Sequence, residues 1–167
     1  MRMKGNILIV DDNKSVLIAM EMLLQTEFEN VYTLRNPSSL LSTIQKYPID
    51  IVLLDMNFKA GINTGNEGIF WLHEIHKHDP AISVVMITAY GDVSLAVKAV
   101  KEGAFDFILK PWDNHHLRLT LRQALDFWEL RSERRYLLDT LQHQNRHLES
   151  IVAQRTRQML AIERQAD

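Results

Sequence analysis

The apolar run at residues 51–54 is the feature that most constrains how this chain folds. Its four consecutive aliphatic side chains lead directly into Asp55. An unbroken run of this kind is typical of a strand that is covered on both faces, as in the parallel sheets of α/β proteins. Asp55 would then lie just past the strand, at the carboxyl edge of the sheet, where open α/β folds bind their ligands.

Three other strand-like runs lead into polar or charged side chains in the same way. They are residues 6–10 before Asp11 and Asp12, residues 83–87 before Thr88, and residues 107–109 before Lys110 and Pro111. Since the carboxyl ends of parallel strands share one edge, we expect these side chains to gather around Asp55. Taken singly, each has an ordinary alternative, such as a helix cap for Asp11, a turn for Asp55 or a solvated loop for Lys110. Their occurrence together at four strand ends is what predicts a site.

Segments with helical spacing separate the strand-like runs through about residue 125. A further strand is expected at residues 31–34, and Gly103 and Asp113 are expected to end one helix and begin another. Strands that alternate with helices predict an α/β fold, a doubly wound five-stranded parallel sheet with helices on both faces. Periodicity alone leaves the strand order open. A flavodoxin-like order, 2-1-3-4-5, would place strands 1, 3, 4 and 5 side by side.

Composition limits the classes of protein to which the chain can belong. Of its 167 residues, 46% are hydrophobic, which is enough for one core and an extension. The net charge of -2 gives no general attraction to nucleic acids or anionic membranes, and without cysteine neither disulfides nor thiolate metal sites can form. The N-terminus lacks a signal-peptide pattern, and no apolar run approaches the roughly 20 residues that span a bilayer. We therefore expect a cytoplasmic protein without direct nucleic-acid or membrane binding.

The sequence changes character after about residue 125. No glycine or proline follows Pro111. Two sets of positions recur every seven residues: Leu130, Leu137, Gln144 and Ile151, and Leu141, Leu148, Arg155 and Ile162. We interpret residues 1–125 as one domain and residues 126–167 as a helical linker that forms a homodimeric coiled coil continuous with the last helix. The polar residues in both sets leave open a single exposed helix or a partly disordered tail.

The expected cluster at the sheet edge has a definite chemistry. Neighbouring carboxylates repel one another unless a cation lies among them. Oxygen ligands in a chain without cysteine suit Mg²⁺, which binds a few carboxylates and keeps several waters. An ionised Asp55 beside such an ion can attack phosphorus, and the Lys110 ammonium and Thr88 hydroxyl are donors that stabilise a phosphoryl group in transfer. The predicted product is an aspartyl phosphate, a labile group suited to signalling.

Four segments together resemble the receiver domain of bacterial two-component response regulators. They are ILIVDD (7–12), IVLLD (51–55), VMITAY (85–90) and KEGAFDFILKPW (101–112). The resemblance covers about residues 4–125 and implies the flavodoxin-like strand order. It is strongest to the receivers of enhancer-binding transcriptional activators, in which a helical linker leads to an ATPase domain and a DNA-binding domain. The implied function is a phosphorelay module that accepts phosphate from a histidine kinase with Mg²⁺ and controls an output, which is expected to be transcription.

The resemblance also implies a role for each residue of the site. Asp55 is implied as the phosphoacceptor, and the ligands implied for Mg²⁺ are Asp11, Asp12, Asp55 and the backbone carbonyl of Asn57. Thr88 and Lys110 are implied as phosphate contacts. The bond before Pro111 is implied to be cis, a form that proline makes accessible.

A conformational switch is implied as well. Thr88 would move toward the phosphoryl group, and Phe107 would turn inward behind it, unless Phe107 is a fixed core aromatic. The resemblance also implies that Asn57 and Tyr90 occupy positions that modulate how fast water removes the phosphate. Beyond self-phosphorylation from a donor and self-dephosphorylation, no enzymatic activity is expected.

Two features depart from the family pattern. Lys59 replaces the proline that usually follows the phosphoacceptor, and the glycine farther on corresponds to Gly68, several residues late. Residues 59–68 therefore resemble an insertion, which is either a tolerated surface loop or a lid or kinase-recognition element. No output domain follows the tail, so we expect a fragment or a truncated regulator.

Two other functions fit parts of the pattern. A phosphatase of the haloacid-dehalogenase type also combines a nucleophilic Asp with Mg²⁺, Thr and Lys. It usually needs a second Asp two residues after the nucleophile, where this chain has Asn57. A receiver that serves only as a dimerisation scaffold would not need these acidic, hydroxyl and lysine positions. The histidines at 73, 76 and 78 are interpreted as solvated side chains, with a metal site as the alternative.

Overall fold

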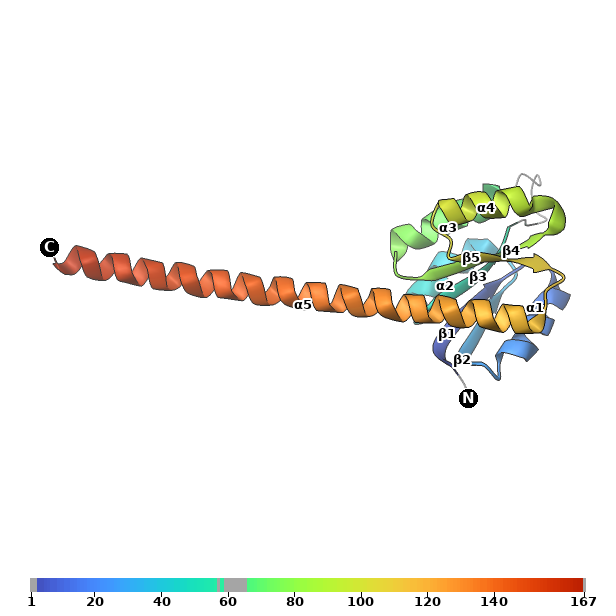
Figure 1. The fold of residues 1–167 in the computed structure, drawn as a ribbon, viewed down its shortest axis with the longest axis horizontal. Coiled ribbons are helices and arrows are strands. Elements are labelled where there is room, and N and C mark those ends of the chain that lie inside the picture. Colours follow the sequence, from blue (N-terminus) through green and yellow to red (C-terminus); the bar gives the residue numbers. More distant parts are fainter. Residues whose placement is uncertain (1–2, 57, 59–65, 167) are drawn as a thin grey trace. The chain divides into compact units, whose positions relative to one another are not determined.

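The structure is a computed structural model that describes residues 3–56, 58 and 66–166. The chain divides into two compact units, Met1–Glu129 and Leu130–Asp167. In the first unit strands and helices alternate, as Figure 1 shows. The elements are β1 (Met3–Val10), α1 (Lys14–Leu24), β2 (Phe28–Leu34), the 3₁₀ helix η1 (Pro37–Ser39), α2 (Leu40–Lys46), β3 (Ile51–Asp55), α3 (Asn66–His78), β4 (Ser83–Ala89), the 3₁₀ helix η2 (Tyr90–Asp92), α4 (Val93–Lys101), β5 (Asp106–Lys110) and α5 (Asn114–Ala166).

The five strands form one parallel sheet in the order β2-β1-β3-β4-β5. This order confirms the predicted doubly wound α/β fold and its flavodoxin-like arrangement. The strand predicted at residues 31–34 begins earlier, at Phe28. The exposed polar residues Glu29 and Asn30 break the apolar pattern there, while the backbone still pairs with β1.

The central strand β3 is buried on both faces along its whole length. Ile51 and Leu53 pack into a core that also contains residues of α1 and α5, whereas Val52 and Leu54 pack into a core with residues of α2, α3 and α4. Figure 1 shows these two sets of helices on opposite sides of the sheet. Full burial of one such side chain contributes about 1.5–3 kcal/mol, so this strand stabilises both layers.

Helix α3 lies very close to the segment that follows β3. A Cβ atom at Gly68 would lie 2.9 Å from the Met56 Cα and 3.0 Å from the Met86 Cε. The Gly68 N–H also donates to the Met56 carbonyl at 3.3 Å. Only a glycine fits this approach, which places the first turn of α3 directly beside the residue after Asp55.

Local chemistry determines where several helices begin and end. The Asn13 side chain caps α1, since its Oδ1 accepts hydrogen bonds from the N–H groups of Ser15 and Val16. The alternative of a helix cap for Asp11 is therefore wrong. Gly103 has a φ of 121° just after α4, in the left-handed region that favours glycine. The Asp113 Oδ1 accepts from the His115 N–H at 3.2 Å, as expected for a residue that begins α5.

The second unit, residues 130–167, contains only the C-terminal part of α5 among its described residues. Many of its apolar side chains are exposed: Leu130, Leu137, Leu138, Leu141, Leu148, Val152, Met159, Leu160 and Ile162. None of the helices in the described part of the chain combines the length and the apolar character needed to cross a bilayer.

Candidate functional site

The sheet register brings four strand ends to the same level. Val10 pairs with Leu54, so the next residues, Asp11 and Asp55, follow neighbouring positions of β1 and β3. Asp55 in turn pairs with Ile87, which directly precedes Thr88. Lys110 pairs with Ala89, which directly follows Thr88. The predicted convergence at the carboxyl edge thus follows from parallel pairing without any bulge between these strands.

Three carboxylates form a cluster at this edge. Asp11, Asp12 and Asp55 each offer one oxygen, and these oxygens all lie within 4.8 Å of one another. Asp11 is completely buried, Asp55 is 5% exposed, and Asp12 is partly buried. Buried carboxylates at such short separations require compensating positive charge.

Lys110 supplies part of that charge. Its Nζ lies 2.8 Å from the Asp11 Oδ2 and 3.4 Å from the Asp55 Oδ1. Burial opposes the charged form and by itself would lower the pKa of Lys110, but the Asp11 contact and the charge of Asp55 outweigh burial and raise this pKa. The lysine is therefore a fixed cation beside two of the three carboxylates.

The Asp11 carboxylate has ligand capacity to spare. Its Oδ1 accepts a hydrogen bond from the Asn13 N–H at 2.9 Å. Its buried Oδ2 is in charge contact with Lys110 but accepts no hydrogen bond of good geometry from the described residues. A buried oxygen in this condition is a suitable ligand for a hard divalent cation, as are the carboxylates of Asp12 and Asp55. The carboxylate oxygens of Asp11, Asp12 and Asp55 are thus a suitable ligand set for Mg²⁺.

Thr88 and Pro111 lie beside the cluster. Thr88 is buried, and its hydroxyl donates to the Ala89 carbonyl at 3.4 Å, a long contact that leaves the hydroxyl weakly held. The Lys110–Pro111 peptide bond is cis. Lys110 is the last residue of β5 and therefore lies at the sheet edge, directly before Pro111.

The remaining predicted residues occupy three different environments. Phe107 is partly buried against the core that contains α3 and α4 residues, whereas Tyr90, in η2, is 69% exposed. Asn57 lies outside the described residues. Of the loop predicted as an insertion, residues 59–65 also lie outside them, while its end, including Gly68, belongs to α3.

Asn13 is a residue of this site that the sequence reasoning missed. It donates its backbone N–H to Asp11 and caps α1 with its side chain. It therefore links the orientation of a buried carboxylate to the start of a helix. The available signal was an Asn directly before the helical apolar spacing of α1, which is typical of an N-cap.

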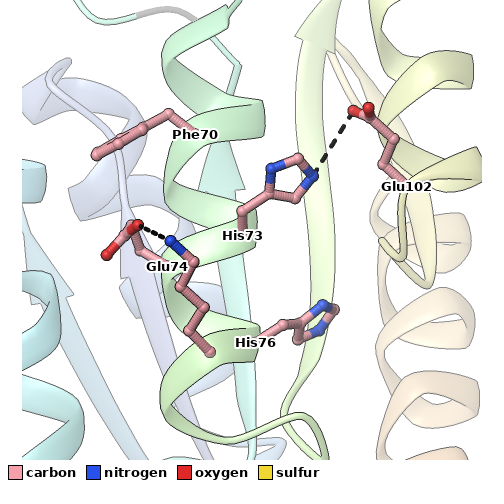
Figure 2. Close-up of a pocket in the computed structure, with 6 residues that line it drawn as sticks. Phe70, His73, Glu74, His76 and Glu102 are labelled. Atoms are coloured by element: carbon pink, nitrogen blue, oxygen red, sulfur yellow. Dashed lines mark hydrogen bonds and ion pairs between the residues drawn. The ribbon is translucent and has the colours of Figure 1, made fainter.

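A second group of titratable side chains lines a pocket of about 470 Å³ formed by residues of α3 and Glu102, just after α4 (Figure 2). The His73 Nε2 lies 3.8 Å from the Glu102 Oε2, and a ring nitrogen of His76 contacts the Ile82 carbonyl at 3.1 Å. Among the described residues, the only three-carboxylate or histidine group close enough to hold an ion is the aspartate cluster. The alternative of a histidine metal site is therefore not supported.

Comparison with known proteins agrees with this geometry. The family described as the response regulator receiver domain matches residues 7–122. The transcriptional regulatory protein ZraR of Escherichia coli K12 is 36% identical over 120 residues, which are 72% of this chain and 26% of that protein. The regulatory protein AtoC of the same organism is 30% identical over 137 residues, 82% of this chain and 29% of its own length. This chain thus spans less than a third of these curated relatives.

Solved structures give the same result. The N-terminal receiver domain of a Bacteroides fragilis two-component response regulator is 50% identical, with a TM-score of 0.67, and the match covers 74% of this chain and 98% of that domain. NtrX from Brucella abortus is 32% identical, with a TM-score of 0.72, over 81% of this chain and 30% of that protein.

Proposed function

This chain belongs to the response regulator receiver domain family, and from that membership we propose that Asp55 is its phosphoacceptor, which receives a phosphoryl group from a partner histidine kinase. Response regulators are phosphorylated by histidine kinases, so the donor class follows from the family. The observation that carries the proposal for this residue is local. Asp55 is one of three clustered carboxylates, and it contacts the Lys110 ammonium at 3.4 Å.

Receiver domains bind Mg²⁺ at an acidic pocket. In this chain the proposed ligands are Asp11, Asp12, Asp55 and the backbone carbonyl of Asn57. The three carboxylate oxygens within 4.8 Å of one another support this assignment. When bound, the ion would neutralise the oxygens of the incoming phosphoryl group.

Asp55, Lys110 and Thr88 have separate proposed roles in the phosphoryl transfer. A carboxylate oxygen of Asp55 attacks the phosphorus of the kinase's phosphohistidine. The phosphorus–nitrogen bond breaks, the imidazole leaves, and an acyl phosphate forms on Asp55. Lys110 holds its charge because its carboxylate contacts raise its pKa, and it lies where the phosphoryl oxygens would gather. Thr88 is buried next to the end of β4 and makes only a long hydrogen bond, so its hydroxyl can be redirected toward the phosphoryl group.

The switch is proposed to use Thr88 and Phe107 together. Phe107 pairs with Met86 in the sheet, two residues before Thr88, and it is only partly buried. A shift of the Thr88 hydroxyl toward Asp55 would leave space behind it, into which the Phe107 ring can turn. Asn57 and Tyr90 are proposed to adjust the lifetime of the phosphate. The exposure of Tyr90 supports this role because its ring can reach solvent near the site.

The output and the assembly are proposed by analogy and composition. Relatives named as transcriptional regulators suggest that the phosphorylated state controls transcription, with the helical segment after the receiver as the connection. Within this chain we assign residues 1–125 to the receiver and 126–167 to the helical linker. The exposed apolar residues of the linker support a homodimer through this helix. In this proposal no separate substrate is turned over, and this chain does not bind DNA directly.

One experiment tests the phosphoacceptor. The protein is incubated with Mg²⁺ and a small phosphodonor, and acid-labile phosphate is measured in the wild type and in Asp55→Asn. We expect about one phosphate per chain in the wild type and none in the variant. Continuous release of phosphate from the donor would point instead to a phosphatase. No incorporation in either protein would point to a scaffold.

A further inference from the structure

The helix of the second unit carries an apolar stripe that no other described residue of this unit covers. Between residues 138 and 162 six apolar side chains follow the alternating three- and four-residue spacing of a coiled-coil seam: Leu138, Leu141, Leu148, Val152, Met159 and Ile162. Each is between 49% and 66% exposed. An exposed apolar stripe of this length on a helix is typical of an interface with another chain.

Two polar residues complete the seam. Asn145 and Arg155 occupy the remaining positions of the same spacing, so the seam has eight positions. This seam shares Leu141, Leu148, Arg155 and Ile162 with the one expected from the sequence. Its other four positions are Leu138, Asn145, Val152 and Met159, each one residue after a position of the expected series counted from Leu137. Three of these four residues are apolar. The expected alternative contains Gln144 and Gln158 in the same stretch, so it would bury less apolar surface.

The seam is self-complementary when reversed. Positions at equal distances from Ser150 form the pairs Leu138 with Ile162, Leu141 with Met159, Asn145 with Arg155, and Leu148 with Val152. In an interface with twofold symmetry, residue i of one copy contacts residue j of the other, and j contacts i. We propose that a second copy of this chain packs on the stripe in antiparallel orientation, centred on Ser150. This inference rests on the homodimer proposed above and specifies its orientation and register.

Arg155 favours this orientation over a parallel one. In a parallel pair at equal register, Arg155 faces the same residue of the second copy. Guanidinium groups only donate hydrogen bonds, so two facing arginines repel and cannot bond to each other. In the antiparallel pair, the Asn145 side-chain oxygen accepts from Arg155, and the two polar positions fall in the same layers. Every other layer is then apolar on both sides.

Cysteine cross-linking tests the register in the full chain, which has no cysteine of its own. Leu141→Cys and Met159→Cys are prepared separately and mixed. Their subunits are allowed to exchange between dimers, and the mixture is then oxidised. The antiparallel pair predicts a disulfide between the two different variants. It predicts none in Leu141→Cys alone, because the two copies of position 141 would lie ~27 Å apart along the helix. Ser150→Cys is the control. Position 150 lies on the side of the helix opposite the seam, so this variant should not cross-link.

Sedimentation equilibrium on the same proteins separates the possible failures. A monomeric wild type would overturn both the homodimer and the register. A dimer in which Leu141→Cys cross-links with itself would overturn the antiparallel register and leave the homodimer intact. A dimer without either cross-link would also overturn the register.

A charge substitution gives an independent test, because the two orientations predict opposite changes in the dimer dissociation constant. Asn145→Asp places a carboxylate opposite Arg155 in the antiparallel pair, but opposite a second carboxylate in the parallel pair. We expect the dimer dissociation constant to fall roughly fivefold at low salt, with a smaller gain at high salt. In an Arg155→Gln background the gain should disappear. A weaker dimer with Asn145→Asp alone would contradict the proposal.

Discussion

The Lys110 ammonium lies 2.8 Å from the Asp11 carboxylate, closer than its 3.4 Å contact with Asp55. The shorter contact places most of the lysine's compensation on a completely buried carboxylate. Asp55 thus keeps an ammonium within reach without being fully neutralised by it. Because the lysine serves two carboxylates, added negative charge on Asp55 would draw it away from Asp11.

Lys110→Met should separate stability from ion binding. The substitution leaves the buried Asp11 carboxylate without its nearest cation. We expect the free energy of unfolding to fall by about 2 kcal/mol without added metal, which is below the usual loss for a fully buried pair because a quarter of the lysine side chain is exposed. Mg²⁺ should bind roughly tenfold more tightly because a competing positive charge is gone.

Urea unfolding and calorimetric titration with Mg²⁺ measure the two effects of Lys110→Met. The exposed Lys101, at the end of α4, provides the control Lys101→Met, for which neither quantity should change. Weaker Mg²⁺ binding by Lys110→Met would show that the lysine does not oppose the ion.

Gly68→Ala should destabilise the first unit although alanine favours a helix. The added Cβ would lie 2.9 Å from a backbone atom of Met56, which cannot move aside as a flexible side-chain end would. We expect a loss of about 1–3 kcal/mol from overpacking, larger than the ~1 kcal/mol gain in helix propensity. Thermal or urea unfolding measures the difference. Gly91→Ala is the matched control, because a Cβ at Gly91 meets nothing within 4 Å, and equal effects at the two glycines would refute the packing argument.

Ser83→Ala tests how the last receiver turn of α5 is attached to the sheet. The buried Ser83 hydroxyl donates to the Ala124 carbonyl at 2.9 Å. Loss of this bond should lower the free energy of unfolding by about 1 kcal/mol. The control is Ser42→Ala, whose exposed hydroxyl donates to the Ser39 carbonyl, and which should change stability by less than about 0.5 kcal/mol. Chemical denaturation measures the free energy of unfolding of both variants. Equal losses in the two variants would argue against a special role for Ser83.

Asp50→Asn should change the pH dependence of stability. Burial raises the pKa of Asp50, the Asn6 N–H bond at 2.9 Å opposes this rise, and the charges of Glu129, Glu29 and Asp79 add to it. An acid with a raised folded-state pKa binds more protons in the folded than in the unfolded protein. The wild type therefore loses stability as the pH rises from the unfolded value of 3.8 through the folded pKa.

The asparagine variant lacks this loss, so it should be more stable than the wild type at neutral pH. The advantage should shrink as the pH falls and vanish below the unfolded pKa. Unfolding curves from pH 3 to 8 measure the difference, with Asp126→Asn as an exposed control carboxyl on α5. A pH-independent difference between Asp50→Asn and the wild type would contradict the burial argument.

Much of the candidate site could be predicted because strand ends are marked in the sequence. Asp11, Asp55, Thr88 and Lys110 each follow an apolar run, and parallel pairing carries all four to one edge. The contact distances could not be predicted in this way. The closer approach of Lys110 to Asp11 depends on a flexible side chain and on the burial of its partners. The part played by Asn13 was missed for a similar reason, since a cap and a carboxylate contact meet only in three dimensions.

By itself the sequence determined the alternation of strands and helices and the burial of β3 on both faces, because the spacing of apolar residues reflects local backbone geometry. It also determined which side chains stand at the strand ends. Only the tertiary structure decided the order of the strands, the glycine contact at Gly68 and the acidic surroundings of Asp50. Each of these depends on segments far apart in the chain, and their approach is governed by crossover connections and packing rather than by local periodicity.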